Sequence, residues 1–308
     1  MQAHDVYVSR RPKIWKGSSM DRKWKTAFLT ILEYREMDPG AVIQSLKGLG
    51  YEGVEWTMDP HFDPDKPISE LKELVERTHD AGMGVSQIMC HEDLVYMDEE
   101  PRRQIIDRIS RTIQAAGECG VEAVSVLTGP EIWETVHVRV NEDMSASEAW
   151  GQAIDAFKTF LGIAEECNVK INSEPVYGML AHDFFTHKWF MDQTPSPMHK
   201  VNLDPSHHVL YGIEDMRWLI NQYGDLISHV HVKDAIGIPE LNKFVFPLLG
   251  EGRVNWDDFF QGLDELDYRG YCSCEFESFR YYRQVLKNDP EAAARVLLEQ
   301  LNVLVESA

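Results

Sequence analysis

The chain has 308 residues, 44% of them hydrophobic, so it can bury a sizeable core and has a length usual for one α/β barrel. Its formal net charge of −21 opposes binding to nucleic acid or to anionic membranes. No run of about 18 apolar residues occurs, so no membrane-spanning helix is expected.

The cysteines and the first residues indicate a reducing, cytoplasmic setting. The five cysteines are an odd number and form no CxxC pair, so a disulfide framework is not expected. Residues 1–24 are polar and basic and lack the apolar stretch of a secretory signal. We interpret them as an N-terminal extension.

From residue 25 onward, β-rich runs alternate with amphipathic helical stretches. In chain order, strands are predicted at 26–31, 51–56, 84–90, 121–128, 169–174, 199–204, 226–233 and 270–276. Helices are predicted after them at 39–49, 69–82, 101–118, 145–167, 181–193, 213–222, 256–265 and 289–305. Strict alternation predicts a closed parallel sheet. The expected fold is α/β, a (β/α)8 TIM barrel forming a single domain at 25–308.

Four consecutive strands end in an acid or an imidazole. Because strand side chains alternate with period two, these four share the inward face of the barrel: Glu174, Asp204, His231 and Glu275. One strand-end acid is as readily a helix cap, but acids gathered at this density would repel one another without a cation among them. Three carboxylates and one imidazole suit Mn²⁺, Mg²⁺, Co²⁺ or Zn²⁺.

Five segments carry a resemblance to a known family. They are Glu174–Pro175, Asn202–His207, His229–Asp234, Gly250–Trp256 and Gly270–Glu275. Together, in this order, they resemble the xylose isomerase-like barrels of the sugar phosphate isomerase/epimerase superfamily over residues 26–305. The resemblance implies one divalent metal ion, with manganese as the expected ion, and a small sugar or sugar derivative as the substrate.

The resemblance also implies roles for single residues. It places the metal on Glu174, Asp204, His231 and Glu275. His207, three residues after Asp204, corresponds to a motif histidine that helps to bind substrate or metal-bound water, and we count it as catalytic. Glu55, at the end of the second strand, is expected to contact the substrate.

Two reactions remain open. In similar epimerases and isomerases, the metal binds adjacent oxygens of a hydroxy-ketone, while two glutamates, here Glu174 and Glu275, act as acid and base on an enediolate. A β-leaving group turns the same chemistry into elimination from an inosose or a 3-oxo-glycoside. Gly237 stands where ketose epimerases tend to carry arginine, which favours this lyase alternative. His137 is then a candidate catalytic base and His91 a second one.

The remaining expectations concern substrate and partners. Alongside Glu55, we expect His91, Trp133 and Lys233 to bind substrate. Similarity to barrels that deglycosylate oxidised C-glycosides leaves a small partner subunit open, and a homo-oligomer is equally open. Cleavage of DNA, as in the endonuclease IV branch, is opposed by the acidic charge and by the lack of histidine in residues 235–250. A non-catalytic ligand-binding barrel is the alternative from another class.

Overall fold

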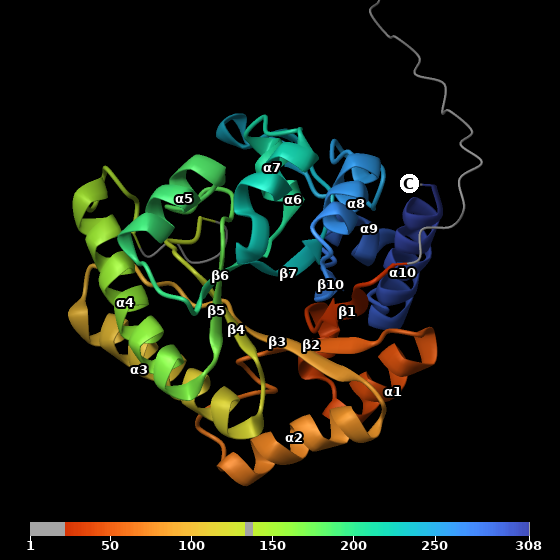
Figure 1. Ribbon diagram of the computed structural model, residues 1–308, viewed down its shortest axis with the longest axis horizontal. Coiled ribbons are helices and arrows are strands. Elements are labelled where there is room, and N and C mark those ends of the chain that lie inside the picture. Colours follow the sequence, from red (N-terminus) through yellow and green to blue (C-terminus); the bar gives the residue numbers. More distant parts are fainter. Residues whose placement is uncertain (1–21, 133–137, 308) are drawn as a thin grey trace, which may run out of the picture.

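The computed structural model describes residues 22–132 and 138–307. Eight parallel strands close a barrel in the order β1-β10-β7-β6-β5-β4-β3-β2, and the helices surround it (Figure 1). The strands are β1 (Lys25–Leu29), β2 (Gly53–Thr57), β3 (Gly84–Cys90), β4 (Ala123–Leu127), β5 (Lys170–Glu174), β6 (His199–Leu203), β7 (Ile227–Val232) and β10 (Tyr271–Cys274). The predicted (β/α)8 barrel is confirmed.

The helices follow the strands in the predicted order. The longer ones are α1 (Pro39–Leu49), α2 (Ile68–Asp80), α3 (Glu99–Cys119), α4 (Ala146–Cys167), α5 (Phe184–Gln193), α7 (Met216–Tyr223), α8 (Trp256–Glu265) and α10 (Pro290–Ser307). The short ones are η1 (Leu32–Glu36), α6 (Pro205–Leu210), η2 (Gly224–Leu226), η3 (Pro239–Leu241), α9 (Phe279–Tyr281) and η4 (Tyr282–Leu286). In the described part of the chain, no helix is long and apolar enough to cross a membrane.

Local sequence signals explain where several helices begin and end. Asp38 caps α1 by accepting a hydrogen bond of 2.8 Å from the backbone N–H of Gly40, and Gly50 ends that helix at φ 102°. Ser145 and Glu148 form a reciprocal capping box at the start of α4. These caps fix the helices that surround the barrel.

The first strand and the segment between β6 and β7 differ from the prediction. The first strand ends at Leu29 instead of residue 31, because the chain turns there into the short helix η1. The segment between β6 and β7 contains α6 as well as the predicted helix. Asp204 caps α6 by accepting a 2.8 Å hydrogen bond from the N–H of Ser206, and Pro205 occupies the first turn.

The buried carboxylate of Asp234, which follows β7, holds the loop at residues 250–256 in place. Asp234 accepts hydrogen bonds from the backbone N–H groups of Gly250 and Gly252, each at 3.0 Å, and from Trp256 Nε1 at 3.1 Å. A Cβ on Gly252 would overlap this carboxylate, so the position requires glycine. In the chain, Asp234 and Gly250 are separated by an antiparallel hairpin of β8 (Ile236–Ile238) and β9 (Lys243–Val245).

The described end of the predicted extension packs on the outside of the barrel. Trp24 is buried and stacks on Phe260 of α8 with ring centroids 5.7 Å apart. Lys23 forms ion pairs with Asp264 and Asp267. All five cysteines are free thiols.

Candidate metal centre

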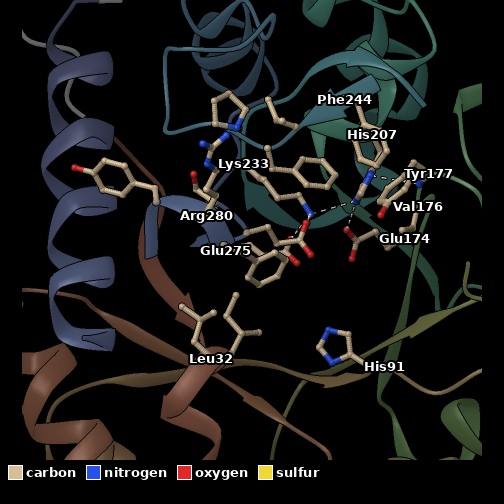
Figure 2. Close-up of a pocket in the computed structure, with 18 of the residues that line it drawn as sticks. Leu32, His91, Glu174, Val176, Tyr177, His207, Lys233, Phe244, Glu275 and Arg280 are labelled. Atoms are coloured by element: carbon tan, nitrogen blue, oxygen red, sulfur yellow. Dashed lines mark hydrogen bonds and ion pairs between the residues drawn. The ribbon is translucent and has the colours of Figure 1, made fainter. Parts of the chain in front are cut away.

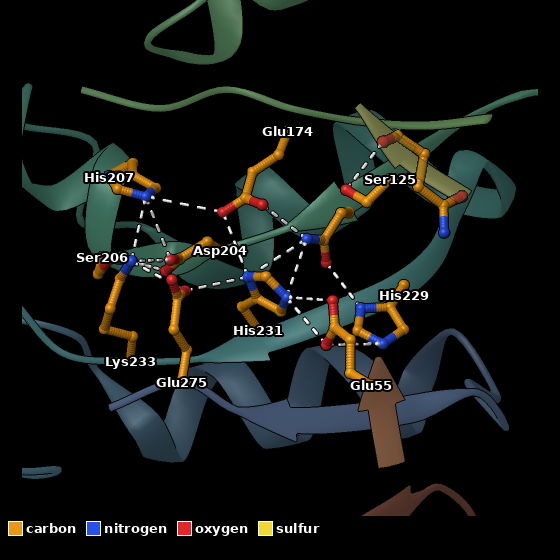
Figure 3. Close-up of polar contacts among 12 residues, drawn as sticks. Glu55, Ser125, Glu174, Asp204, Ser206, His207, His229, His231, Lys233 and Glu275 are labelled. Atoms are coloured by element: carbon orange, nitrogen blue, oxygen red, sulfur yellow. Dashed lines mark hydrogen bonds and ion pairs between the residues drawn. The ribbon is translucent and has the colours of Figure 1, made fainter. Parts of the chain in front are cut away.

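Four side chains from neighbouring strands meet at the C-terminal mouth of the barrel (Figure 3). Glu174 ends β5, Asp204 follows β6, His231 lies in β7 and Glu275 follows β10. All four are buried, and each offers one ligand atom within 4.8 Å of the other three. The residues predicted as metal ligands from strand phase therefore lie together.

The closest contacts among the four ligands are made by one nitrogen of the His231 imidazole. His231 Nδ1 lies 3.0 Å from Glu275 Oε2 and 3.3 Å from Glu174 Oε1. Asp204 turns Oδ2 toward the cluster, and this buried oxygen lies 3.1 Å from Lys233 Nζ and 3.3 Å from His207 Nε2. Its other oxygen caps α6, so one carboxylate serves both the helix and the cluster.

These distances and atoms fit a divalent ion. Two ligands bonded to one ion at about 2.0–2.2 Å lie roughly 3.0–3.4 Å apart, which matches the contacts of His231 Nδ1. Three carboxylate oxygens and one imidazole nitrogen are donors that Mn²⁺, Mg²⁺, Co²⁺ and Zn²⁺ accept. We conclude that the residues present can hold such an ion.

The charges of the cluster depend strongly on one another. Burial raises the pKa of Glu174, and it raises the pKa of Asp204 to about 6 although the Lys233 ammonium opposes this. Burial also acts to raise the pKa of Glu275, but Lys233 and His231 hold it well below its ordinary value. For His231, the effect of burial is outweighed by Glu174, Glu55 and Glu275, which raise its pKa. The cluster thus retains positive charge on His231, and an ion would replace the Nδ1 proton.

His207 lies beside the acids, as its position after β6 predicted. Its Nε2 is 3.3 Å from Asp204 Oδ2 and 3.7 Å from Glu174 Oε1. Burial, followed by Lys233, lowers its pKa well below the ordinary range, so the ring is neutral. Nδ1 accepts from the backbone N–H of Tyr177 at 3.3 Å, and Nε2 faces the acids and lies 3.3 Å from Lys233 Nζ.

A buried lysine pairs with three acids at the edge of the cluster. Lys233 Nζ lies 3.1 Å from Asp204 Oδ2 and 2.9 Å from both Glu275 Oε2 and Glu277 Oε2. Phe246 covers the ammonium at 4.8 Å from its ring centroid. Lys233 therefore neutralises acids that point into the mouth.

Part of the cluster borders a cavity of about 1170 Å³ (Figure 2). Glu174, Glu275, His207 and Lys233 border this space. An apolar wall faces it, formed by Met89, Leu127 and Val176, which belong to a separate buried apolar cluster at the mouth. Aromatic side chains line another part of it: Tyr177, Phe244, Phe246, Phe279 and Tyr281. Other charged side chains also border it, among them Arg35, Glu92 and Arg280, so the cavity combines a charged end with walls of mixed character.

The other predicted site residues divide into three groups. His91 borders the cavity, as expected of a residue that contacts substrate (Figure 2). Glu55 does not border it: the side chain is fully buried behind His231, so the structure gives no support to its predicted contact with substrate. Trp133 and His137 lie outside the described residues.

Sequence reasoning gave too little weight to two residues. Glu277, which the sequence analysis did not place in the site, borders the cavity and pairs with Lys233. The period-two phase that selected Glu275 also selects Glu277 and could have found it. Gln87 was not singled out, although its amide donates a 2.7 Å hydrogen bond to Glu55 inside the barrel.

Comparison with known sequences decides the family. A profile described as "Xylose isomerase-like TIM barrel" matches residues 43–302. The chain belongs to this family. No curated protein matches this xylose isomerase-like barrel in sequence.

Solved structures share the fold of this xylose isomerase-like barrel at low sequence identity. D-psicose 3-epimerase with D-tagatose from Clostridium cellulolyticum H10 has 17% identity and TM-score 0.72, covering 91% of this chain and 98% of that one. The 3-keto-D-glucoside 4-epimerase YcjR from E. coli has 18% identity and TM-score 0.68, covering 91% and 99%. An IOLI protein with a bound zinc atom has 17% identity and TM-score 0.70, covering 91% and 98%.

Proposed function

We propose that this chain is a divalent-metal-dependent isomerase or epimerase that enolises a keto-sugar or keto-polyol. The observation that carries the proposal is the convergence of Glu174, Asp204, His231 and Glu275, of which Glu174 and Glu275 border a large cavity. Structures of similar fold include epimerases that act on sugars, and one holds zinc. Manganese is the ion we expect in the cell.

We assign a separate chemical role to each residue at the charged end of the cavity. A divalent ion held by the four clustered residues would polarise a carbonyl and acidify the neighbouring C–H. Glu174 and Glu275 border the cavity and can remove a proton from that carbon and return it. The Nε2 edge of His207 and the ammonium of Lys233 lie beside the acids, where they can stabilise negative charge that develops on a substrate oxygen.

The size of the cavity favours a second candidate, elimination of a group from an oxidised glycoside. Pockets for drug-sized ligands usually span roughly 300–1,000 Å³. The cavity here, about 1170 Å³, exceeds that range, whereas a free ketose is smaller than such ligands. Its apolar side, with Met89, Leu127 and Phe244, suits a substrate that carries an apolar group on the sugar. Loss of that group from the enolate would make the enzyme a lyase.

Incubation in D₂O separates these reactions. The manganese-loaded protein would be incubated with free ketoses, inososes and 3-oxo-glycosides bearing aromatic aglycones, with Glu275→Gln as the matched control. Deuterium on the carbon beside the carbonyl supports enolisation, and release of the aglycone supports elimination. If the wild type catalyses neither exchange nor release with any compound, the non-catalytic ligand-binding barrel is favoured instead.

A further inference from the structure

A further buried carboxylate lies behind the metal-ligand cluster, on the side away from the cavity. Glu55, in β2, is completely buried, and its Oε1 and Oε2 lie 3.1 and 3.2 Å from His231 Nε2 (Figure 3). Glu174 and Glu275 approach the same ring from the Nδ1 side. The imidazole of His231 thus lies between two sets of carboxylates.

This placement determines which ring nitrogen can bind a cation. A neutral imidazole carries one proton, and the nitrogen without it is the ligand. When Nε2 donates its proton to Glu55, Nδ1 keeps a free lone pair directed at Glu174 and Glu275. A carboxylate acceptor on the far nitrogen also makes the coordinating nitrogen a stronger donor.

Glu55 is itself held in place by buried amides. Gln87 Nε2 donates to Glu55 Oε1 over 2.7 Å, and Asn172 Nδ2 donates to Gln87 Oε1 over 2.6 Å. These contacts join β2, β3 and β5 across the barrel interior. Because the amides fix the carboxylate, the orientation of the His231 ring is fixed as well.

A second ligand is oriented in a similar way. Asn202 Nδ2 donates to Glu174 Oε2 over 2.7 Å, which leaves Glu174 Oε1 facing His231 Nδ1. His229 Nδ1 donates to Asn202 Oδ1 over 2.8 Å and so fixes the orientation of the amide. The side chains beneath the cluster therefore orient two ligands so that His231 Nδ1 and Glu174 Oε1 face the cluster.

We propose that Glu55 is a positioning residue of the metal centre: it accepts the Nε2 proton of His231 and makes Nδ1 the coordinating nitrogen. This inference rests on the metal site of the proposed function. It replaces the contact with substrate that the sequence had suggested for Glu55.

The test compares Glu55→Gln with Glu52→Gln in the full chain. Glu52 lies just before the same strand, at the end opposite to the mouth of the barrel. Its partly exposed side chain accepts a hydrogen bond from the backbone N–H of Thr26 at 2.9 Å. Loss of an outer carboxylate partner typically weakens metal binding by roughly 10–100-fold. We expect that loss for Mn²⁺ with Glu55→Gln, measured by competition with a fluorescent chelator, and less than about threefold with Glu52→Gln.

The outcomes separate this inference from the proposed function. Tight binding by the wild type and equal binding by folded Glu55→Gln would overturn the role of Glu55 alone. Absence of binding by the wild type would overturn the metal site on which both rest. Two ions per wild-type chain, falling to one in Glu55→Gln, would place an ion between Glu55 and His231 and contradict the proposed hydrogen bond.

A second measurement is made on the wild-type protein and uses a variant only to assign signals. In zinc-loaded wild-type protein labelled with ¹⁵N-histidine, the signals of His231 can be assigned by comparison with His231→Asn. We expect a proton on Nε2 and none on Nδ1. A proton on Nδ1 would overturn the assignment of Glu55.

Discussion

Lys233 donates a hydrogen bond of 2.9 Å to Glu275, a predicted metal ligand, from inside the barrel mouth. The same ammonium lies 3.1 Å from Asp204 Oδ2. Two ligand acids thus share one buried cation. Removing that cation leaves carboxylates buried without their partner, which is more costly than the loss of an exposed ion pair.

We therefore expect Lys233→Met to lower the free energy of unfolding by about 3–5 kcal/mol in EDTA-treated protein, measured by urea denaturation. Saturating Mn²⁺ should restore more stability to this variant than to the wild type, since the ion relieves the repulsion. Lys170→Met is the control, because Lys170 pairs with the exposed Glu122 and its loss should cost under about 1 kcal/mol. Equal effects of the two substitutions would contradict the account of Lys233.

Glu275 and Glu277 lie two residues apart, and both pair with Lys233, but only Glu275 lies in the ligand set. Glu275→Gln should weaken Mn²⁺ binding by more than roughly 100-fold, since it removes a ligand and not an outer partner. Glu174→Gln should do the same, and Glu277→Gln should change the affinity far less. Isothermal titration of the three variants makes the comparison, and equal losses would show that the phase after β10 has been misassigned.

Phe279 borders the cavity and is 43% exposed. If the substrate carries an apolar group, Phe279→Ala should raise KM for a 3-oxo-glycoside about tenfold, since burial of such a side chain contributes about 1.5–3 kcal/mol. KM for a free ketose should hardly change. Phe185→Ala, on helix α5 and 62% exposed, is the control. A KM unchanged for every substrate would argue against an apolar group in this part of the cavity.

Asp93 joins the loops after β3 and β4 by accepting from the N–H of Glu131 at 3.2 Å. Burial raises its pKa to about 7, although this hydrogen bond opposes the shift. A raised pKa favours the protonated acid in the folded state, so its contribution to stability is lost as pH rises toward 7. Asp93→Asn should therefore gain stability over the wild type by at most about 1.4 kcal/mol per pH unit between pH 4 and 7.

Thermal unfolding of both proteins across this pH range checks the prediction for Asp93. Because the two chains share all other titrating groups, their difference isolates this carboxyl. A stability difference that does not vary with pH would show that Asp93 ionises in the folded protein as it does in the unfolded chain.

Strand phase was sufficient to predict the centre of the site. Barrel strands present alternate residues inward, so Glu174, His231 and Glu275 could be placed on one interior face before any coordinates were known. Parallel order then brought the ends of β5, β6, β7 and β10 to one mouth. These two regularities are local and periodic, which is why the sequence reveals them.

Contacts across the barrel could not be predicted in this way. The approach of Glu55 to His231 joins β2 to β7, which are not neighbours in the sheet, and depends on the width of the barrel and on side-chain rotamers. Helix α6 was missed because its six residues are too short for an apolar period to emerge. The size of the cavity depends on how the loops at the barrel mouth pack. These loops have no periodic pattern of apolar residues from which their packing could be predicted.

The most direct test of the metal centre is anomalous diffraction from crystals of the manganese-loaded protein, recorded on both sides of the manganese absorption edge. The account predicts one peak per chain at about 2.0–2.3 Å from each of Glu174 Oε1, Asp204 Oδ2, His231 Nδ1 and Glu275 Oε2. Manganese bound elsewhere, or no peak among these four atoms at saturating concentration, would contradict it.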